Sequence, residues 1–286
     1  MLDFLILLPG ILALIGTILP LFNAEAWWIR IFDFPRIQIM FLAIMGIFFS
    51  LTYSDLGDYR VIIYNCLLLA AGFYQIFRIY PYTPFSKIQV YDSKMSEHDG
   101  QVSIMMFNVL TTNKKSEACR SLIQKVDPDV ILLVETDKWW QKELMVLEET
   151  YKWKLHAPFG NTYGMLLYSK LPIEDGEIKF LWEYDIPSIH CHLVLKNGVK
   201  VKFYGVHPKP PAPGESKSSV KRDAELVMVG KECATLRKPI IVAGDLNDVA
   251  WSDTTHLFQR ISGLLDPRRG RGMFPTFNSK YKLFRW

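Results

Sequence analysis

The sequence predicts an α/β domain preceded by transmembrane helices, and three observations predict it. The first 85 residues form long apolar runs, the remainder alternates short apolar runs with helical patterns, and several short runs end in a polar residue. Residues 1–85 carry only four of the 33 Lys and Arg and five of the 29 Asp and Glu. This break near residue 85 separates two regions, and the second, of about 200 residues, is long enough for one hydrophobic core.

The first region holds three apolar runs, which are Leu2–Phe22, Ile37–Tyr53 and Val61–Ile79. A membrane span needs about 20 apolar residues, within a range of about 17–25. Aromatic residues at the edges of the runs are typical of membrane interfaces. A signal peptide followed by buried core helices is disfavoured, because the first run lacks a basic flank and an A-x-A-like cleavage site. We therefore expect residues 1–85 to form about three transmembrane helices, as in a multi-pass protein of the bacterial inner (plasma) membrane.

The distribution of basic residues indicates which side of the membrane the rest of the chain occupies. The first loop holds Arg30 and Arg36, and Arg78 and two lysines follow at the end of the third run, whereas Arg60 stands alone in the second loop. The positive-inside rule then favours a cytoplasmic position for the first loop and for the C-terminal region. Residues 86–100 are rich in polar residues and are predicted to be a linker.

The second region, residues 101–286, contains strand-like and helix-like segments in mixed order. The predicted strands are Val102–Leu110, Val130–Val134, Gly164–Ser169, Ile189–Leu195, Val199–Val206 and Pro239–Gly244. The predicted helices are Ser116–Val126, Trp139–Thr150 and Ser216–Leu236. Asn197 and Gly198 predict a hairpin between two of the strands. Together these segments predict an α/β sandwich with its functional site at the strand ends.

Polar residues at those strand ends are the candidate site residues. Glu135 follows an apolar strand and is a hard-oxygen ligand suited to Mg²⁺ or Mn²⁺, although a single acid at this position is more often an exposed strand-end residue that caps the next helix. Asn108 could position the metal or a phosphate oxygen, or could simply be a turn residue. Asp245 and Asn247 follow a buried strand, where an Asx turn is the alternative, and His207 precedes a proline.

Four motifs occur in order, and together they resemble the endonuclease/exonuclease/phosphatase superfamily. They are Phe107-Asn108-Val109, Asp129–Glu135, Gly205–Pro208 and Gly244–Asn247. Within this superfamily the chain is most similar to bacterial proteins with N-terminal membrane spans. The resemblance implies a four-layer α/β sandwich and a divalent metal, Mg²⁺ or Mn²⁺, held by Glu135 and Asn108. It also implies that Asp245 orients or deprotonates the attacking water, that Asn247 holds the phosphate, and that His207 contacts a phosphate oxygen or serves in acid–base chemistry.

The resemblance also implies two later segments, an Asp-(aromatic or His)-Ile strand and a closing Asp-His pair, and neither occurs before Trp286. We therefore expect a C-terminally incomplete domain that hydrolyses phosphodiesters weakly or not at all. Three functions stay open: a metal-dependent phosphodiesterase, phosphatase or nuclease, an inactive homologue of one, and a membrane protein that binds a phosphorylated ligand. Nucleic acid, phospholipid and sugar phosphate are all possible phosphoester substrates. The sequence gives no sign of an obligate protein partner.

Overall fold

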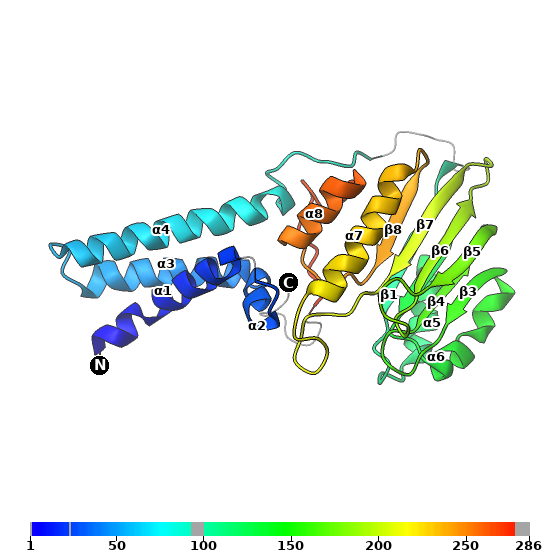
Figure 1. The fold of residues 1–286 in the computed structure, drawn as a ribbon, viewed down its shortest axis with the longest axis horizontal. Helices are drawn as coiled ribbons and strands as arrows, with labels where there is room; N and C mark the ends of the chain where they lie inside the picture. Colours follow the sequence, from blue (N-terminus) through cyan, green and yellow to red (C-terminus); the bar gives the residue numbers. More distant parts are fainter. Residues whose placement is uncertain (1, 23, 93–99, 278–286) are drawn as a thin grey trace.

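The computed structural model describes residues 2–22, 24–92 and 100–277, with the side chains of residues 2–5 left out. Three long helices form a bundle that extends from one side of an α/β body (Figure 1). They are α1 (Leu2–Ile18), α3 (Arg36–Tyr53) and α4 (Tyr59–Ile79). We call α1, α3 and α4 the helical bundle, and residues 100–277 the α/β body.

The helical bundle is held together by small and aliphatic residues along its axis. Ala13, Ala43 and Leu68 are buried in one cluster. A Cβ atom at Gly46 would lie 2.6 Å from the Cα atom of Gly10, so the backbones of α1 and α3 approach too closely for any larger residue. Large apolar side chains point outward over most of the bundle surface. This is the distribution expected of helices surrounded by hydrocarbon.

Two segments of the described chain are long and apolar enough to cross a membrane, Arg36–Tyr53 and Tyr59–Tyr82, and a third, Ile6–Phe22, is apolar but shorter. Short helices connect the bundle to the body: η1 (Leu19–Phe22), α2 (Trp27–Arg30), η2 (Ile31–Asp33) and η3 (Tyr80–Tyr82). All four lie at or lead from the end of the bundle that faces the body, whereas the loop between α3 and α4 lies at the opposite end (Figure 1).

The α/β body contains two four-stranded sheets. The first has the order β1-β2-β4-β3 and the second the order β5-β6-β7-β8. The strands of the first sheet are β1 (Ile104–Asn108), β2 (Val130–Val134), β3 (Trp153–Ala157) and β4 (Met165–Ser169). Those of the second are β5 (Ile173–Lys179), β6 (Ser188–Val194), β7 (Lys200–Val206) and β8 (Ile240–Gly244). The pairs β1–β2 and β7–β8 are parallel, and the other pairs are antiparallel.

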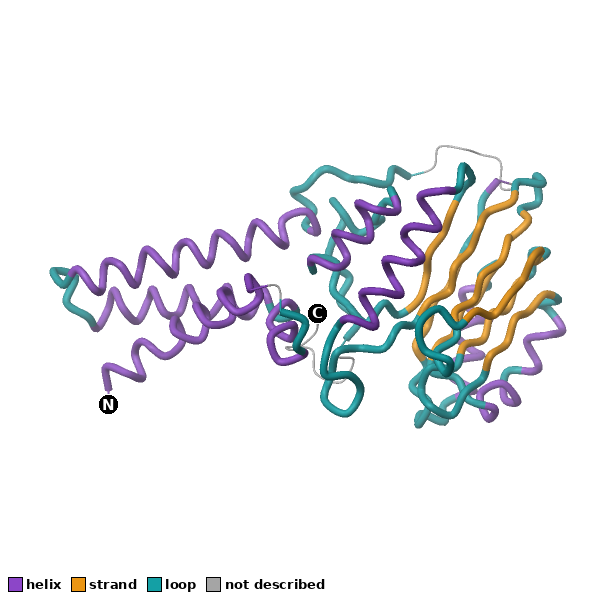
Figure 2. The backbone as a smooth tube through the Cα atoms, viewed as in Figure 1, coloured by secondary structure: helices purple, strands orange, loops and turns teal. Residues whose placement is uncertain are grey.

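Helices cover the outer face of each sheet, so the body has four layers (Figure 2). The two sheets share a core in which Leu132 and Leu167 pack with Phe203. The helices are α5 (Ser116–Val126), α6 (Lys138–Glu143), η5 (Met145–Glu149), α7 (Val220–Thr235) and α8 (Asp253–Ser262). Helices α5 and α6 with η5 cover the first sheet, whereas α7 and α8 cover the second. The predicted α/β sandwich is therefore confirmed.

Several element boundaries differ from the sequence prediction. The helix predicted over Trp139–Thr150 is divided at Leu144 into α6 and η5. Strands β3 and β5 and helix α8 were not predicted, because β5 alternates charged residues and α8 is short and rich in polar residues. The fold places them through tertiary packing, as when Phe258 of α8 joins the core beneath α7.

The predicted linker, residues 86–100, lies partly outside the described residues, since 93–99 are not described. Its first part does not run free of the body. The side-chain oxygen of Gln89 accepts a hydrogen bond from the Asp266 backbone amide at 2.9 Å, and Arg271 donates to the Val90 carbonyl at 2.7 Å. The division of the chain at residues 85 and 100 stays a prediction.

Candidate active site

The candidate site lies where four strands of the two sheets end. Asn108 is the last residue of β1. Glu135 comes directly after β2, His207 directly after β7, and Asp245 directly after β8. The parallel pairing sets Asn108 opposite Val134 and Val206 opposite Gly244. Because parallel strands finish at the same edge, the sequence-predicted residues from both sheets meet there.

The side chain of Asn108 connects the two sheets at this edge. Its amide nitrogen, Nδ2, donates to Glu135 Oε1 at 2.7 Å and to Asp245 Oδ2 at 3.1 Å. Its oxygen, Oδ1, accepts a hydrogen bond from the Leu110 amide at 3.0 Å. A primary amide has two N–H groups, so one side chain satisfies one oxygen of each carboxylate. The structure thus brings together Asn108, Glu135 and Asp245, and their roles stay a prediction.

The backbone around these residues adopts conformations that side chains seldom favour. Glu135 and Asn247 have φ of 60° and 50°, in the left-handed region. The Glu135 carbonyl accepts a hydrogen bond from the Thr111 hydroxyl at 2.7 Å, which holds this turn in place. Gly244 has φ of 144°, and a Cβ atom there would lie 1.8 Å from the Val206 carbonyl oxygen. Only glycine fits directly before Asp245.

Asn247 lies beside Asp245, and its side chain is turned toward the loop after β7. Its backbone amide donates to Asp245 Oδ1 at 3.1 Å, and its Nδ2 donates to the Pro208 carbonyl at 2.9 Å. The second N–H of this amide has no acceptor among residues 2–22, 24–92 and 100–277. The Asx turn considered for Asp245 is therefore present, and it fixes the carboxylate toward Asn108.

A buried ion pair supports the same loop, and no sequence pattern predicted it. Arg222 in α7 donates to the Asn247 carbonyl at 2.9 Å and lies 3.3 Å from Asp248 Oδ2. Burial raises the pKa of Asp248 to about 6, an effect that the charge of Arg222 partly opposes. Asp248 also accepts a hydrogen bond from the Ser252 hydroxyl at 2.6 Å. An arginine in the first turn of a helix was the only available signal, and it does not identify its partner.

His207 is buried beside the carboxylates, with 3% of its surface exposed. Its ring packs against Tyr163, with ring centroids 5.3 Å apart, and its Nδ1 atom has no hydrogen-bond partner among the described residues. Burial lowers the pKa of His207, and the charges of Asp245 and Glu135 oppose this only in part. The imidazole is therefore neutral near pH 7. Its predicted contact with a phosphate oxygen stays a prediction.

The oxygen atoms at this edge fit a hard divalent cation. In the described part of the chain no three His, Cys, Asp or Glu residues form a metal-binding group. Two carboxylates do meet, however, and the partial positive charge of the Asn108 amide lies between them. A cation such as Mg²⁺ meets the same electrostatic demand and keeps several water ligands, so it does not need a complete set of protein ligands.

The polar edge opens into a cavity of about 340 Å³. Asp245 and Asn247 lie in its lining, together with residues of α2 and of the C-terminal part of the described chain. Arg268 also lines this cavity, while its guanidinium is paired with Asp266 at 2.7 Å. Arg271 lies elsewhere and pairs with Asp92.

Comparison with known proteins gives one family match and several structural similarities. Residues 105–286 match the model of the Endonuclease/Exonuclease/phosphatase family. No curated protein matches the sequence. A similar solved structure is TDP2 of D. rerio in complex with a single-strand DNA product, at 18% identity and a TM-score of 0.47, covering 55% of this chain and 66% of that one.

Two further solved structures come from bacteria. A beta-hairpin deletion mutant of beta toxin from Staphylococcus aureus has 15% identity and a TM-score of 0.46, covering 59% of this chain and 75% of that one. Sphingomyelinase C from Streptomyces griseocarneus has 16% identity and a TM-score of 0.44, covering 58% and 70%. The chain spans less than two thirds of the TDP2 chains, and only 62% of the humanized D. rerio protein.

Proposed function

The chain belongs to the Endonuclease/Exonuclease/phosphatase family, and from this premise we propose that it is a membrane-anchored, divalent-metal-dependent phosphoester hydrolase. The observation that carries the proposal is the meeting of Asn108, Glu135 and Asp245 at one edge of the two sheets. Carboxylates forced together at strand ends are costly for stability, and they serve a reaction that needs concentrated negative charge.

We propose Glu135 and Asn108 as the residues that hold the metal, Mg²⁺ or Mn²⁺. Members of the family generally depend on a divalent metal. When bound, such an ion neutralises charge on the phosphate oxygens and lowers the pKa of a water molecule. The part of Glu135 is to supply a carboxylate whose direction is set by Asn108 and by the turn that Thr111 holds.

The remaining proposed roles follow from the contacts of each side chain. Asp245 orients the attacking water and accepts its proton, while the N–H of Asn247 that Pro208 does not use donates to a phosphate oxygen. The neutral His207 also contacts a phosphate oxygen, through the Nδ1 atom that has no hydrogen-bond partner among the described residues. The water oxygen forms a bond to phosphorus and the ester P–O bond breaks. The departing oxygen takes up a proton from solvent water, and Asp245 returns the proton that it accepted to solvent. The products are an alcohol and a phosphate with one ester bond fewer.

The helical bundle supports membrane anchoring. Two of its segments are long and apolar enough to span a bilayer, and the first loop and the exit from α4 lie at the same end of the bundle (Figure 1). Three spans would produce this arrangement, with the α/β body on the side where Arg30, Arg36 and Arg78 lie. If the helical bundle spans the plasma membrane of a bacterium, the positive-inside rule places that side in the cytoplasm.

The proposal is tested with the full chain in detergent micelles and a chromogenic aryl phosphodiester. In keeping with the weak activity expected from the sequence, we expect slow hydrolysis that requires Mg²⁺ or Mn²⁺, stops with a chelator, and falls by at least about a hundredfold in Glu135→Gln, as for loss of one central charged group. Glu143→Gln is the matched control, since Glu143 pairs with Arg120 away from the site. Hydrolysis that is unaffected by the chelator and by Glu135→Gln would refute the proposal.

A second candidate is a protein that binds a phosphorylated ligand without hydrolysing it. It is favoured by the burial of His207, which leaves the imidazole 3% exposed and neutral, and so poorly suited to protonate a leaving group. Calorimetric titration with Mg²⁺ and inorganic phosphate separates the two candidates. Binding that depends on Glu135, with no turnover of any ester, would favour the binding protein.

A further inference from the structure

The cavity beside the candidate site has one polar end and mostly apolar walls. Asp245 and Asn247 lie at the polar end. The apolar walls come from four parts of the chain that are distant in sequence, and include Ile31, Phe34, Pro210, Trp251, Met273 and Phe274. A phosphate group alone would leave these walls in contact with water. Their chemistry suits a ligand that joins a phosphate to a hydrocarbon group.

One wall of this cavity belongs to the segment between the two first helices of the bundle. Ile31 begins η2, which leads into α3, and Trp27 of α2 lines the cavity as well. Neighbouring Trp28 is 51% exposed. Tryptophans at the end of apolar helices are typical of the headgroup level of a bilayer. The cavity therefore lies where the spans of the proposed anchor leave the hydrocarbon.

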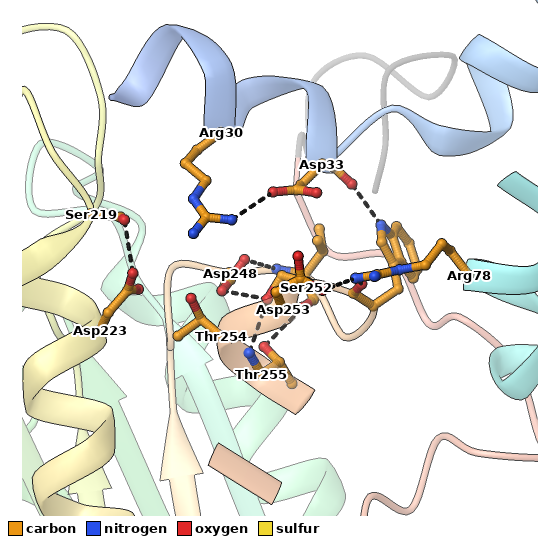
Figure 3. Close-up of polar contacts among 12 residues, drawn as sticks. Arg30, Asp33, Arg78, Ser219, Asp223, Asp248, Ser252, Asp253, Thr254 and Thr255 are labelled. Carbon is orange, nitrogen blue, oxygen red and sulfur yellow. Dashed lines mark hydrogen bonds and ion pairs between the residues drawn. The ribbon is translucent and has the colours of Figure 1, made fainter. Parts of the chain in front are cut away.

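Hydrogen bonds fix the loop that carries the site against this end of the bundle. Trp251 donates from its indole nitrogen to the Asp33 carbonyl at 2.7 Å, and Tyr82 donates from its hydroxyl to the Ala250 carbonyl at 2.6 Å. Figure 3 shows Arg78 of α4 reaching Asp253 at the start of α8, where the ion pair measures 2.7 Å. The candidate site is thus held at a fixed, short distance from the spans.

We propose that the cavity receives a hydrocarbon chain of a membrane lipid phosphoester whose phosphate lies at Asp245 and Asn247. The proposal rests on the proposed hydrolase function and names its substrate class. A cavity of about 340 Å³ holds roughly ten methylene-sized groups, if each takes about the 30 Å³ of a liquid water molecule. A lipid in the same bilayer would deliver its chain from the side of Ile31 and its phosphate to the polar end.

Nucleic acid is the less suitable substrate for this cavity. A channel for single-stranded nucleic acid combines exposed aromatic rings with a basic groove along the backbone. Of the described residues that line the cavity, Arg268 alone is basic, and its guanidinium is already paired with Asp266. The described lining of the cavity therefore lacks the positive charges that would bind the successive phosphates of a nucleic acid. A ligand with one phosphate ester does not need such a row of charges.

The first experiment measures hydrolysis of p-nitrophenyl phosphodiesters whose second ester group is methyl, butyl or octyl, by the full chain in micelles with Mg²⁺. The leaving group is the same throughout, so differences report the alkyl chain. Three methylenes at about 0.8 kcal/mol each correspond to about sixtyfold when fully buried. We expect kcat/KM to rise about tenfold or more from methyl to butyl, and further to octyl.

Two variants test whether the cavity causes that rise. Ala212→Trp would fill part of the cavity, and Ile31→Gln would make one wall polar without disturbing a buried residue, because Ile31 is 47% exposed. In both we expect the octyl-to-methyl ratio to fall at least fivefold. Val126→Trp is the control, on the exposed end of α5, and should keep the ratio of the unmodified chain.

The second experiment measures binding of methyl, butyl and octyl phosphate by isothermal titration, and it does not need turnover. All variants are compared in the same micelles, so partitioning of the ligand into detergent cancels. Affinity that rises with chain length, and does so less in Ala212→Trp, would support the cavity assignment even if no ester were hydrolysed and the proposed function failed. Hydrolysis that depends on Glu135 but not on chain length would overturn the inference and leave the proposed function standing. Equal binding of all three phosphates would overturn it as well.

Discussion

Without Mg²⁺, replacement of Glu135 by glutamine should leave the protein as stable or make it slightly more stable. With Mg²⁺, the same replacement should make the protein less stable than the unmodified chain. In the metal-free protein, Asn108 Nδ2 lies 2.7 Å from Glu135 Oε1 and 3.1 Å from Asp245 Oδ2. The two oxygens are therefore at most about 6 Å apart, where like charges repel by about 3 kcal/mol at an effective dielectric constant of 20. Both side chains are partly exposed, so screening reduces this to about 1–2 kcal/mol.

Glu135→Gln removes that repulsion and weakens one charge-assisted hydrogen bond from Asn108, at a cost of about 1 kcal/mol. The metal-free variant should therefore be as stable as the unmodified chain or slightly more stable. With Mg²⁺ at a hundred times its dissociation constant, the unmodified chain should gain about 2.7 kcal/mol. At about 2–4 °C per kcal/mol for a domain of this size, Tm should rise by about 5–11 °C, and by less than about 2 °C in the variant.

The assay is thermal unfolding of the full chain in micelles, with a chelator and with increasing Mg²⁺. Glu143→Gln serves as control, because it removes the same charge from an ion pair with Arg120 and should retain the full Mg²⁺ response. An equal rise of Tm in Glu135→Gln and in the unmodified chain would refute the metal-binding role of Glu135. A Glu135→Gln protein that is clearly less stable without metal would refute the argument from repulsion.

Two further predictions concern the buried charges of the body. Arg222→Met should lower the free energy of unfolding by about 3–5 kcal/mol, because it leaves Asp248 buried without its partner. In urea unfolding, the double variant Arg222→Met with Asp248→Asn should recover most of that loss. A double variant as unstable as the single one would contradict this. Stability should be greatest near pH 6.5. Burial raises the pKa of Glu225 to about 8, so the folded protein holds a proton that the unfolded chain releases, and stability falls as the pH rises toward 8. Burial lowers the pKa of His156 and His190 to about 4, so stability also falls as the pH drops from 6.5 toward 4. The slope between pH 6.5 and 8 should be about 1.4 kcal/mol per pH unit, the effect of one proton. Tm measured against pH should lose its alkaline decline in Glu225→Gln; an unchanged alkaline decline there would show that Glu225 is not its cause.

The sequence predicted the parts of the site that depend on strand ends. Asn108, Glu135 and Asp245 each follow an apolar run that forms a strand, and parallel pairing then brings them together with little further information. The support beneath them was not predictable in this way. Arg222 and Asp248 lie in different elements, and only the packing of α7 against the loop after β8 makes them partners.

The contact between the bundle and the body was also beyond the sequence patterns. Hydrophobic periodicity identifies a span or a core helix, but it does not state which loop meets the end of a span. The indole of Trp251 donates a hydrogen bond to the Asp33 carbonyl, a contact that no pattern in the sequence predicts. The positive charges at Arg30 and Arg36, counted for orientation, are buried in ion pairs with Asp33 at this contact.

The bond between Asp33 and Trp251 joins positions 218 residues apart, and this separation sets an order for the biogenesis of the chain. Synthesis proceeds from the N-terminus, so the bundle leaves the ribosome and enters its final surroundings long before residue 251 is made. The loop that carries Asp245 and Asn247 then closes on a surface that already exists. The helical bundle then acts as a template for one of the last segments of the body to fold. A circular permutant with the bundle at its C-terminus would keep every contact and reverse that order, so a slower final folding step in the permutant would measure how much the template contributes.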